Sequence, residues 1–107
     1  MKSLKVVQPQ GILNGISANE LRRDVNDLVL EGADIVLIDF QDVTFIDSSG
    51  LGALVATLKT VRSAGAKLYV CSINEQVKMV FELTRMERIF ETFTNRDEFN
   101  RQLLTTQ

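Results

Sequence analysis

The chain has 107 residues, 45% of them hydrophobic, which fits the usual size and composition of a single folded domain. Twelve basic and fourteen acidic residues give a formal charge of −2, without the dense Lys and Arg stripe that a nucleic-acid backbone requires. Histidine is absent, which excludes His-based triads and the usual zinc ligand sets. We therefore expect no nucleic acid, metal or cofactor, and a binding function is favoured over catalysis.

The cysteine content and the lack of apolar segments indicate the cellular compartment. Cys71 is the only cysteine, so no internal disulfide can form and a reducing environment is indicated. The first residues are not followed by the apolar core of a signal peptide, and apolar runs such as Ile35–Ile38 are far too short to span a membrane. A cytoplasmic protein without a membrane partner is expected.

The first part of the chain predicts extended structure followed by a helix. Leu4–Val7 and Gly11–Leu13 are β-prone segments that a proline-containing turn separates. Ser17 and Glu20 have the spacing of a capping box, so a helix is expected to begin at Ser17. Gly32 is well placed to end that helix.

The middle of the chain predicts the centre of a sheet and a second helix. Ile35–Phe40 is a nearly continuous apolar run, as in a strand that helices cover on both faces, and Val43–Ile46 continues extended after a bend. Apolar residues at helical spacing then form one stripe: Leu51, Leu54, Val55, Leu58 and Val61. This helix is expected to start at Ser48 and Ser49 and to end at Gly65.

The last third predicts two more strand–helix pairs. Lys67–Ile73 is β-rich, and Asn74 is expected to cap a third helix. Arg88–Phe93 can form a last short strand, and Asn95 can cap a C-terminal helix. The alternation predicts an α/β sandwich with a mixed four- to five-stranded sheet and about four helices packed on it, as a single domain over residues 1–107.

The segment Asp47–Gly52 concentrates a carboxylate, two hydroxyls and two glycines where a strand gives way to a helix. Unpaired amides and the positive end of the helix dipole favour a phosphate on Ser48. Phosphorylation would add about −1.5 to −2 charges, enough to alter a complementary surface without unfolding the domain. Gly50 and Gly52 lack side chains and are expected to let a partner backbone or a kinase approach the hydroxyl.

Other interpretations of this segment either give it a purely structural role or require residues that the sequence lacks. Ser48 or Ser49 can be an ordinary N-cap worth about 1 kcal/mol, with glycines that only permit tight helix packing. The third glycine of a dinucleotide fingerprint is Val55 here, and there is no P-loop. A receiver-type phosphoaspartate at Asp47 lacks the acidic pair for magnesium, and a phosphate-ester enzyme lacks a base and a metal cluster.

The octapeptide Phe45–Gly52 resembles the signature of the STAS domain, in particular that of the bacterial anti-sigma factor antagonists. Gly11–Asn14 is similar to the early glycine-x-leucine-aspartate segment of that family, and Asp34–Phe40 resembles its central strand. Gly65–Ile73 and Val77–Phe81 resemble its later strand and helix. The resemblance covers nearly the whole chain.

The resemblance implies a partner-switching mechanism. The unphosphorylated antagonist binds an anti-sigma factor that is also a serine kinase, which frees the sigma factor; phosphorylation breaks the complex and a PP2C-type phosphatase restores it. The phosphoacceptor maps to Ser48, ATP and magnesium belong to the kinase, and the chain itself is no enzyme. The residues expected to contact the partner are Asn14, Asp47, Ser49, Gly50, Leu51 and Gly52.

One departure and one alternative accompany this interpretation. Asn14 stands where many antagonists have an aspartate, so kinase contact or phosphorylation efficiency is expected to differ. The alternative is a constitutive scaffold or ligand-sensing STAS module whose serine is only a cap and which needs no kinase. We expect no appended sensor or transporter domain, which weakens this alternative.

Overall fold

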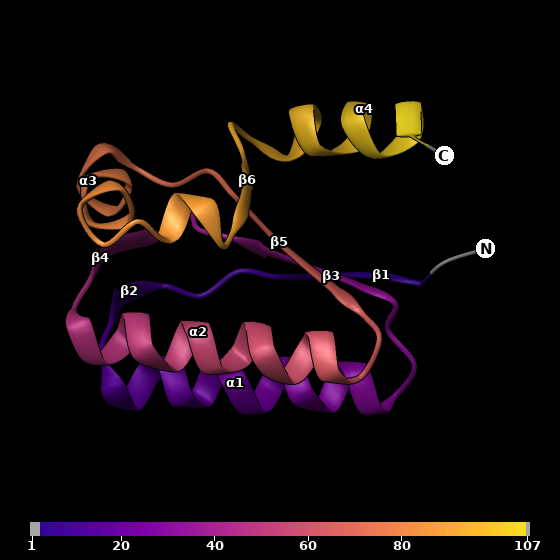
Figure 1. Cartoon of the computed structure of the whole chain (residues 1–107), viewed down its shortest axis with the longest axis horizontal. Coiled ribbons are helices and arrows are strands. Elements are labelled where there is room, and N and C mark those ends of the chain that lie inside the picture. Colours follow the sequence, from indigo (N-terminus) through magenta and orange to yellow (C-terminus); the bar gives the residue numbers. More distant parts are fainter. Residues whose placement is uncertain (1–2, 107) are drawn as a thin grey trace.

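A computed structural model describes residues 3–106, with side chains up to residue 103. Figure 1 shows two helices on one side of the strands and the C-terminal helix on the other. The elements in chain order are β1 (Leu4–Val7), β2 (Gly11–Leu13), α1 (Gly15–Leu30), β3 (Ile35–Asp39), β4 (Val43–Ile46), α2 (Ser48–Ser63), β5 (Lys67–Cys71), α3 (Glu75–Leu83), the short 3₁₀ helix η1 (Met86–Arg88), β6 (Glu91–Phe93) and α4 (Arg96–Thr106).

The described strands pair only in parallel and form two sheets. One has the order β1-β3-β5-β6, and the other pairs β2 with β4. The α/β fold class is confirmed, but the prediction of one mixed sheet is wrong. Residues 8–10 separate β1 from β2, and residues 40–42 separate β3 from β4. The first strand of each segment pairs in the large sheet and the second strand pairs in the small sheet, so the two segments run side by side. Pro9 has no amide to donate, which contributes to the first break.

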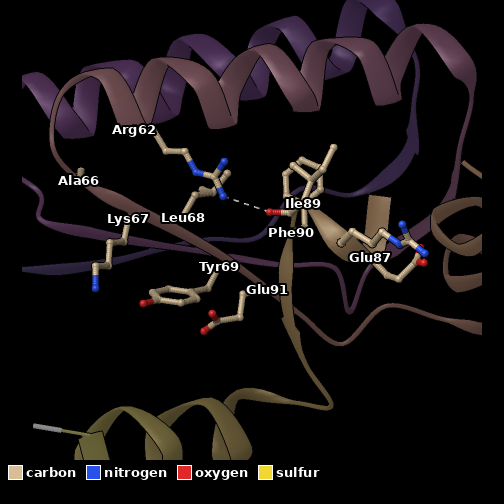
Figure 2. Close-up of a pocket in the computed structure, with 10 residues that line it drawn as sticks. Arg62, Ala66, Lys67, Leu68, Tyr69, Glu87, Ile89, Phe90 and Glu91 are labelled. Carbon is tan, nitrogen blue, oxygen red and sulfur yellow. Dashed lines mark hydrogen bonds between the residues drawn. The ribbon is translucent and has the colours of Figure 1, made fainter. Parts of the chain in front are cut away.

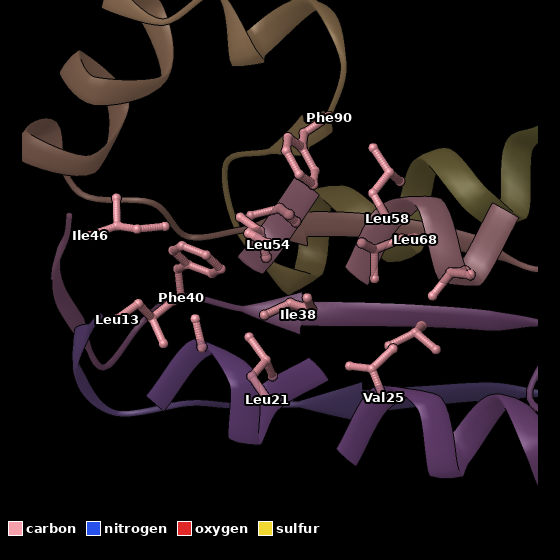
Figure 3. Packing of buried hydrophobic residues seen from close by; sticks show 14 of the residues in the cluster. Leu13, Leu21, Val25, Ile38, Phe40, Ile46, Leu54, Leu58, Leu68 and Phe90 are labelled. Atoms are coloured by element: carbon pink, nitrogen blue, oxygen red, sulfur yellow. The ribbon is translucent and has the colours of Figure 1, made fainter. Parts of the chain in front are cut away.

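The main core lies between the four-stranded sheet and the helix pair α1 and α2. Both helices bury residues at spacings of three and four, which line one face of each helix. Figure 3 shows Leu21 and Val25 of α1, Leu54 and Leu58 of α2, and Ile38 of β3 converging in this layer. All five residues of β3 are buried, which confirms it as a strand covered on both faces.

The start of α1 differs from the prediction. The helix begins at Gly15, and Asn14 is its N-cap: the Asn14 Oδ1 accepts from the amides of Ile16 and Ser17, each at 3.0 Å. The Ser17 hydroxyl accepts the Asn14 amide in return at 2.9 Å. A capping box is therefore present, but it joins Asn14 and Ser17, and the predicted box of Ser17 with Glu20 is wrong.

Most other predicted boundaries are confirmed. Gly32 and Gly65 follow α1 and α2 with φ of 104° and 80°, a conformation that glycine adopts without strain. Asn74 and Asn95 each accept an amide of the helix that follows, at 2.8 Å. The predicted strand Arg88–Phe93 is shorter in the structure, because η1 precedes β6 and ends at residue 88. None of the described helices is both long and apolar enough to cross a membrane.

The second face of the sheet is covered by α4. Phe99 of α4 is fully buried, and its ring lies 5.4 Å from that of Tyr69 and 5.2 Å from that of Phe93, between centroids. At the start of α4, the Arg96 Nε donates to the Asp39 Oδ2 at 2.6 Å. Asp39 ends the central strand and is 1% exposed, so this ion pair fixes α4 to the sheet.

Candidate functional site

The site is formed where two strand–helix units end side by side. Leu13 at the end of β2 pairs with Ile46 at the end of β4, and each strand leads through one residue into its helix. The Asp47 amide donates to the Leu13 carbonyl at 3.1 Å, which ties the two junctions together. As Figure 1 shows, α1 and α2 therefore begin at the same edge of the domain. The positive ends of both dipoles favour an anionic group there.

Asp47 is the N-cap of α2. Its backbone is extended and its Oδ1 accepts the Gly50 amide at 2.7 Å. The helix begins at Ser48, as predicted, but the interpretation of Ser48 or Ser49 as the cap is wrong. Both serines are exposed, and between residues 3 and 106 neither hydroxyl has a hydrogen-bond partner. Ser48 therefore has no capping role that would explain it.

Ser49 and Asn14 lie at the seam between the two helices. A Cβ built on Gly15, the first residue of α1, would lie 3.4 Å from the Ser49 Cβ. Asn14 is exposed, and its side-chain oxygen is engaged in capping α1. Because asparagine caps as well as aspartate, this residue preserves the helix start while leaving one carboxylate fewer at the shared edge.

Of the residues expected to contact a partner, Gly50 and Leu51 are buried and Gly52 is exposed. A Cβ on Gly50 would lie 2.0 Å from the Leu13 carbonyl oxygen, so this buried glycine permits the close approach of β2 to α2. Leu51 is 8% exposed and packs in the core. Gly50 and Leu51 therefore expose little surface, and their contact with a partner stays a prediction. Gly52 is exposed, and nothing lies within 4 Å of a Cβ built there, so its role as a partner contact stays a prediction.

An exposed apolar surface flanks the two caps and was missed in the sequence. Ile12 and Phe45 are register partners in β2 and β4 and are 54% and 40% exposed, while Ile16 in the first turn of α1 is 76% exposed. We call these three residues the apolar rim. The sequence offered one signal for this surface, because successive side chains of a strand point to opposite faces of the sheet. The residues that precede buried Leu13 and Ile46 therefore point away from the core. Exposed apolar side chains that lie together, as those of Ile12 and Phe45 do in paired strands, mark interaction surfaces.

The chemistry available here suits docking and modification. Among the described residues, no group of three His, Cys, Asp or Glu side chains is placed to hold a metal ion. The site offers exposed hydroxyls on Ser48 and Ser49, two helix amino ends and the apolar rim. This arrangement can bind a protein surface and can accept a phosphate next to favourable dipoles.

Replacing Asp47 separates its capping role from its charge. Asp47→Ala removes the bond to the Gly50 amide and is expected to lower the free energy of unfolding by about 1 kcal/mol. Asp47→Asn keeps an acceptor at the cap and is expected to leave stability nearly unchanged. Urea unfolding followed by circular dichroism measures both, and an equal loss in the two variants would disprove the capping assignment.

Comparisons with known proteins identify the family of the chain. A family model described as the STAS domain matches residues 2–99. The anti-sigma-B factor antagonist of Bacillus subtilis (strain 168) is 33% identical over 81 residues, which cover 76% of this chain and 73% of that protein. A solved structure from Thermotoga maritima, provisionally described as an anti-sigma factor antagonist, is 30% identical with a TM-score of 0.81, covering 91% of this chain and 84% of that one.

More distant structures share the fold. The unphosphorylated form of the anti-sigma factor antagonist SpoIIAA gives a TM-score of 0.75 at 16% identity, covering 94% of this chain and 89% of that one. The STAS domain of a SulP transporter from Vibrio cholerae gives 0.79 at 16% identity, covering 100% and 88%. The fold thus occurs in both regulators and transporter domains. With this family match and these relatives, the chain belongs to the STAS domain family.

Proposed function

We propose that this chain is a cytoplasmic anti-sigma factor antagonist that binds an anti-sigma factor/serine kinase and is released when Ser48 is phosphorylated. The carrying observation is that Asp47 caps α2, which leaves the exposed Ser48 hydroxyl without a structural partner among residues 3–106. Support comes from the relatives in Bacillus subtilis and Staphylococcus aureus, both named anti-sigma-B factor antagonists. SpoIIAA, which shares the fold, has been solved in a phosphorylated form.

In the unphosphorylated state, the partner is expected to cover the apolar rim and the neutral start of α2. Burial of Ile12, Ile16 and Phe45 supplies hydrophobic contact area, and exposed Gly52 allows a close backbone approach. In this state the chain contributes a surface and a hydroxyl, while ATP and magnesium belong to the kinase, so the chain is not an enzyme.

Phosphorylation is expected to break this contact without unfolding the domain. A phosphate adds about −1.5 to −2 charges beside the Asp47 carboxylate, in a surface that the partner must desolvate. The amino ends of α1 and α2 stabilise the same charge from within the domain. The fold is thus retained while the complex is weakened, and a PP2C-type phosphatase would restore binding.

Phosphopeptide mapping tests the assignment. The chain is incubated with ATP, magnesium and each anti-sigma factor/serine kinase of the same genome, and intact mass and peptide maps are recorded. One phosphate on Ser48 is expected, with none on the Ser48→Ala variant and normal addition to the Ser49→Ala control. If Ser49→Ala alone abolishes the reaction, the acceptor is misassigned. If no kinase adds a phosphate, the constitutive scaffold alternative, which the transporter domains of the same fold favour, replaces the switch.

A further inference from the structure

A second candidate site lies at the opposite end of α2 from Ser48. A cavity of about 470 Å³ opens between the last turn of α2, the start of β5 and the segment from η1 to β6. Because α2 has 16 residues, it spans about 24 Å and separates this cavity from the start of the helix. Buried Leu68 and Phe90 are among its lining residues, together with Ala66 and Ile89.

The sheet topology creates this cavity. The pairing of β5 with β6 begins at Tyr69 and Glu91, so Lys67 and Leu68 at the start of β5 lie beyond the ladder. The segment that precedes β6 forms η1 instead of strand and borders the opening. The cavity therefore lies beside Lys67 and Leu68, where β6 does not extend along β5. Its walls belong to elements that pack in the core.

The lining of the cavity carries more positive than negative side chains. Its lining contains three cations and two carboxylates, namely Arg62, Lys67, Arg88, Glu87 and Glu91. In the part of the chain that the structure describes, none of these side chains forms an ion pair. Arg62 Nη2 donates to the Ile89 carbonyl at 3.2 Å, which holds the guanidinium on the α2 side of β5, whereas Lys67, Tyr69 and Glu91 lie on the other side of this strand, as Figure 2 shows.

Tyr69 adds a flat surface and a hydrogen-bond donor. Its side chain is half-buried and lines the cavity beside Glu91. Burial raises the pKa of the Tyr69 phenol above its ordinary value, and the negative charge of Glu91 raises that pKa further. The hydroxyl is therefore protonated at neutral pH and can donate to an anionic oxygen.

We propose that this cavity binds a small organic anion in which a carboxylate or phosphate is joined to a flat apolar body. At the open edge of β5, Arg62 holds the anionic oxygens from the α2 side and Lys67 from the other side, and the body lies against Tyr69 and Ile89. The planar guanidinium suits two oxygens of one anionic group, and the volume lies within the range of small-molecule sites. This site is independent of Ser48, so neither the phosphorylation switch nor its failure decides the proposal.

NMR titration of the unphosphorylated chain tests this site with defined probes. Phenyl phosphate and benzoate are added to ¹⁵N-labelled protein, with phenol as the neutral control. Saturable shifts of the Leu68, Tyr69 and Phe90 amides are expected with at least one anion and not with phenol. Arg62→Gln and Lys67→Gln are each expected to weaken binding about tenfold, because a charged hydrogen-bond partner of the anion is lost.

Two controls keep the result interpretable. Lys59→Gln removes an exposed cation of the same helix that does not line the cavity, and is expected to leave the affinity unchanged. Lys67→Gln breaks no hydrogen bond found in the described residues, so it reports binding even if Arg62→Gln disturbs the contact with Ile89. Absence of saturable shifts with both anions, or equal affinity in both Gln variants and the unmodified chain, would overturn the proposal.

Discussion

Gly50→Ala is expected to lower the free energy of unfolding by about 3 kcal/mol or more, since overpacking a core costs about 1–3 kcal/mol and more where the backbone must move. The new Cβ would lie 2.0 Å from the Leu13 carbonyl oxygen and 2.7 Å from its carbon. These are backbone atoms and cannot rotate away, so β2 and the start of α2 must separate. Urea unfolding monitored by circular dichroism measures the loss.

Gly52→Ala is the matched control in the same helix. No atom lies within 4 Å of a Cβ built there, and alanine is a better helix residue than glycine. This variant is therefore expected to be more stable by about 0.5–1 kcal/mol. If Gly50→Ala costs less than about 1 kcal/mol, which is within the range of an ordinary substitution, the close approach of β2 to α2 is not as described.

Arg96→Ala is expected to lower the free energy of unfolding by about 2–3 kcal/mol, below the 3–5 kcal/mol typical of a broken buried ion pair. Asp39 is 1% exposed and would keep a buried charge, with the Gln41 amide still donating to its Oδ1 at 2.9 Å. The cost is reduced because the Arg96 side chain is 45% exposed and water can reach the site. Urea unfolding gives the magnitude, and faster amide exchange in α4 would show loosening of that helix.

A neutral partner separates the charge effect from lost packing. Asp39→Asn combined with Arg96→Ala is expected to recover part of the loss, since no unpaired carboxylate then stays buried. Arg88→Ala removes an exposed arginine without an ion pair in the described chain and is expected to change stability by less than about 0.5 kcal/mol. Equal effects of Arg96→Ala and Arg88→Ala would contradict the role of the ion pair.

The local sequence predicted most elements of the fold but not the pairing of its strands. Apolar periodicity located the helices, and Gly32 and Gly65 marked two helix ends, because a positive φ is a local requirement. The strand breaks at residues 8–10 and 40–42 divide two extended segments between two sheets, and this division depends on contacts between residues far apart in the chain. The start of α1 was ambiguous because Asn14 and Ser17 are both favourable N-cap residues.

The sequence singled out the start of α2 as the candidate site, and the structure gives several of its residues capping or packing roles. The hydroxyls and glycines at the start of α2 were visible in the sequence. The burial of Gly50 depends on the Leu13 carbonyl, and this proximity arises only when β2 pairs with β4. The same pairing places Ile12 beside Phe45 and creates the apolar rim, so neither feature follows from a local motif.

The affinity of the chain for its anti-sigma factor/serine kinase, measured by calorimetry before and after complete phosphorylation of Ser48, tests the central claim most directly. The kinase is kept in its ADP-bound form so that no phosphate is transferred during the titration. Phosphorylation is expected to weaken binding about thirtyfold or more, as for an unpaired charge in an interface, while Ser48→Ala retains binding. Equal affinity of the two forms would contradict the switch.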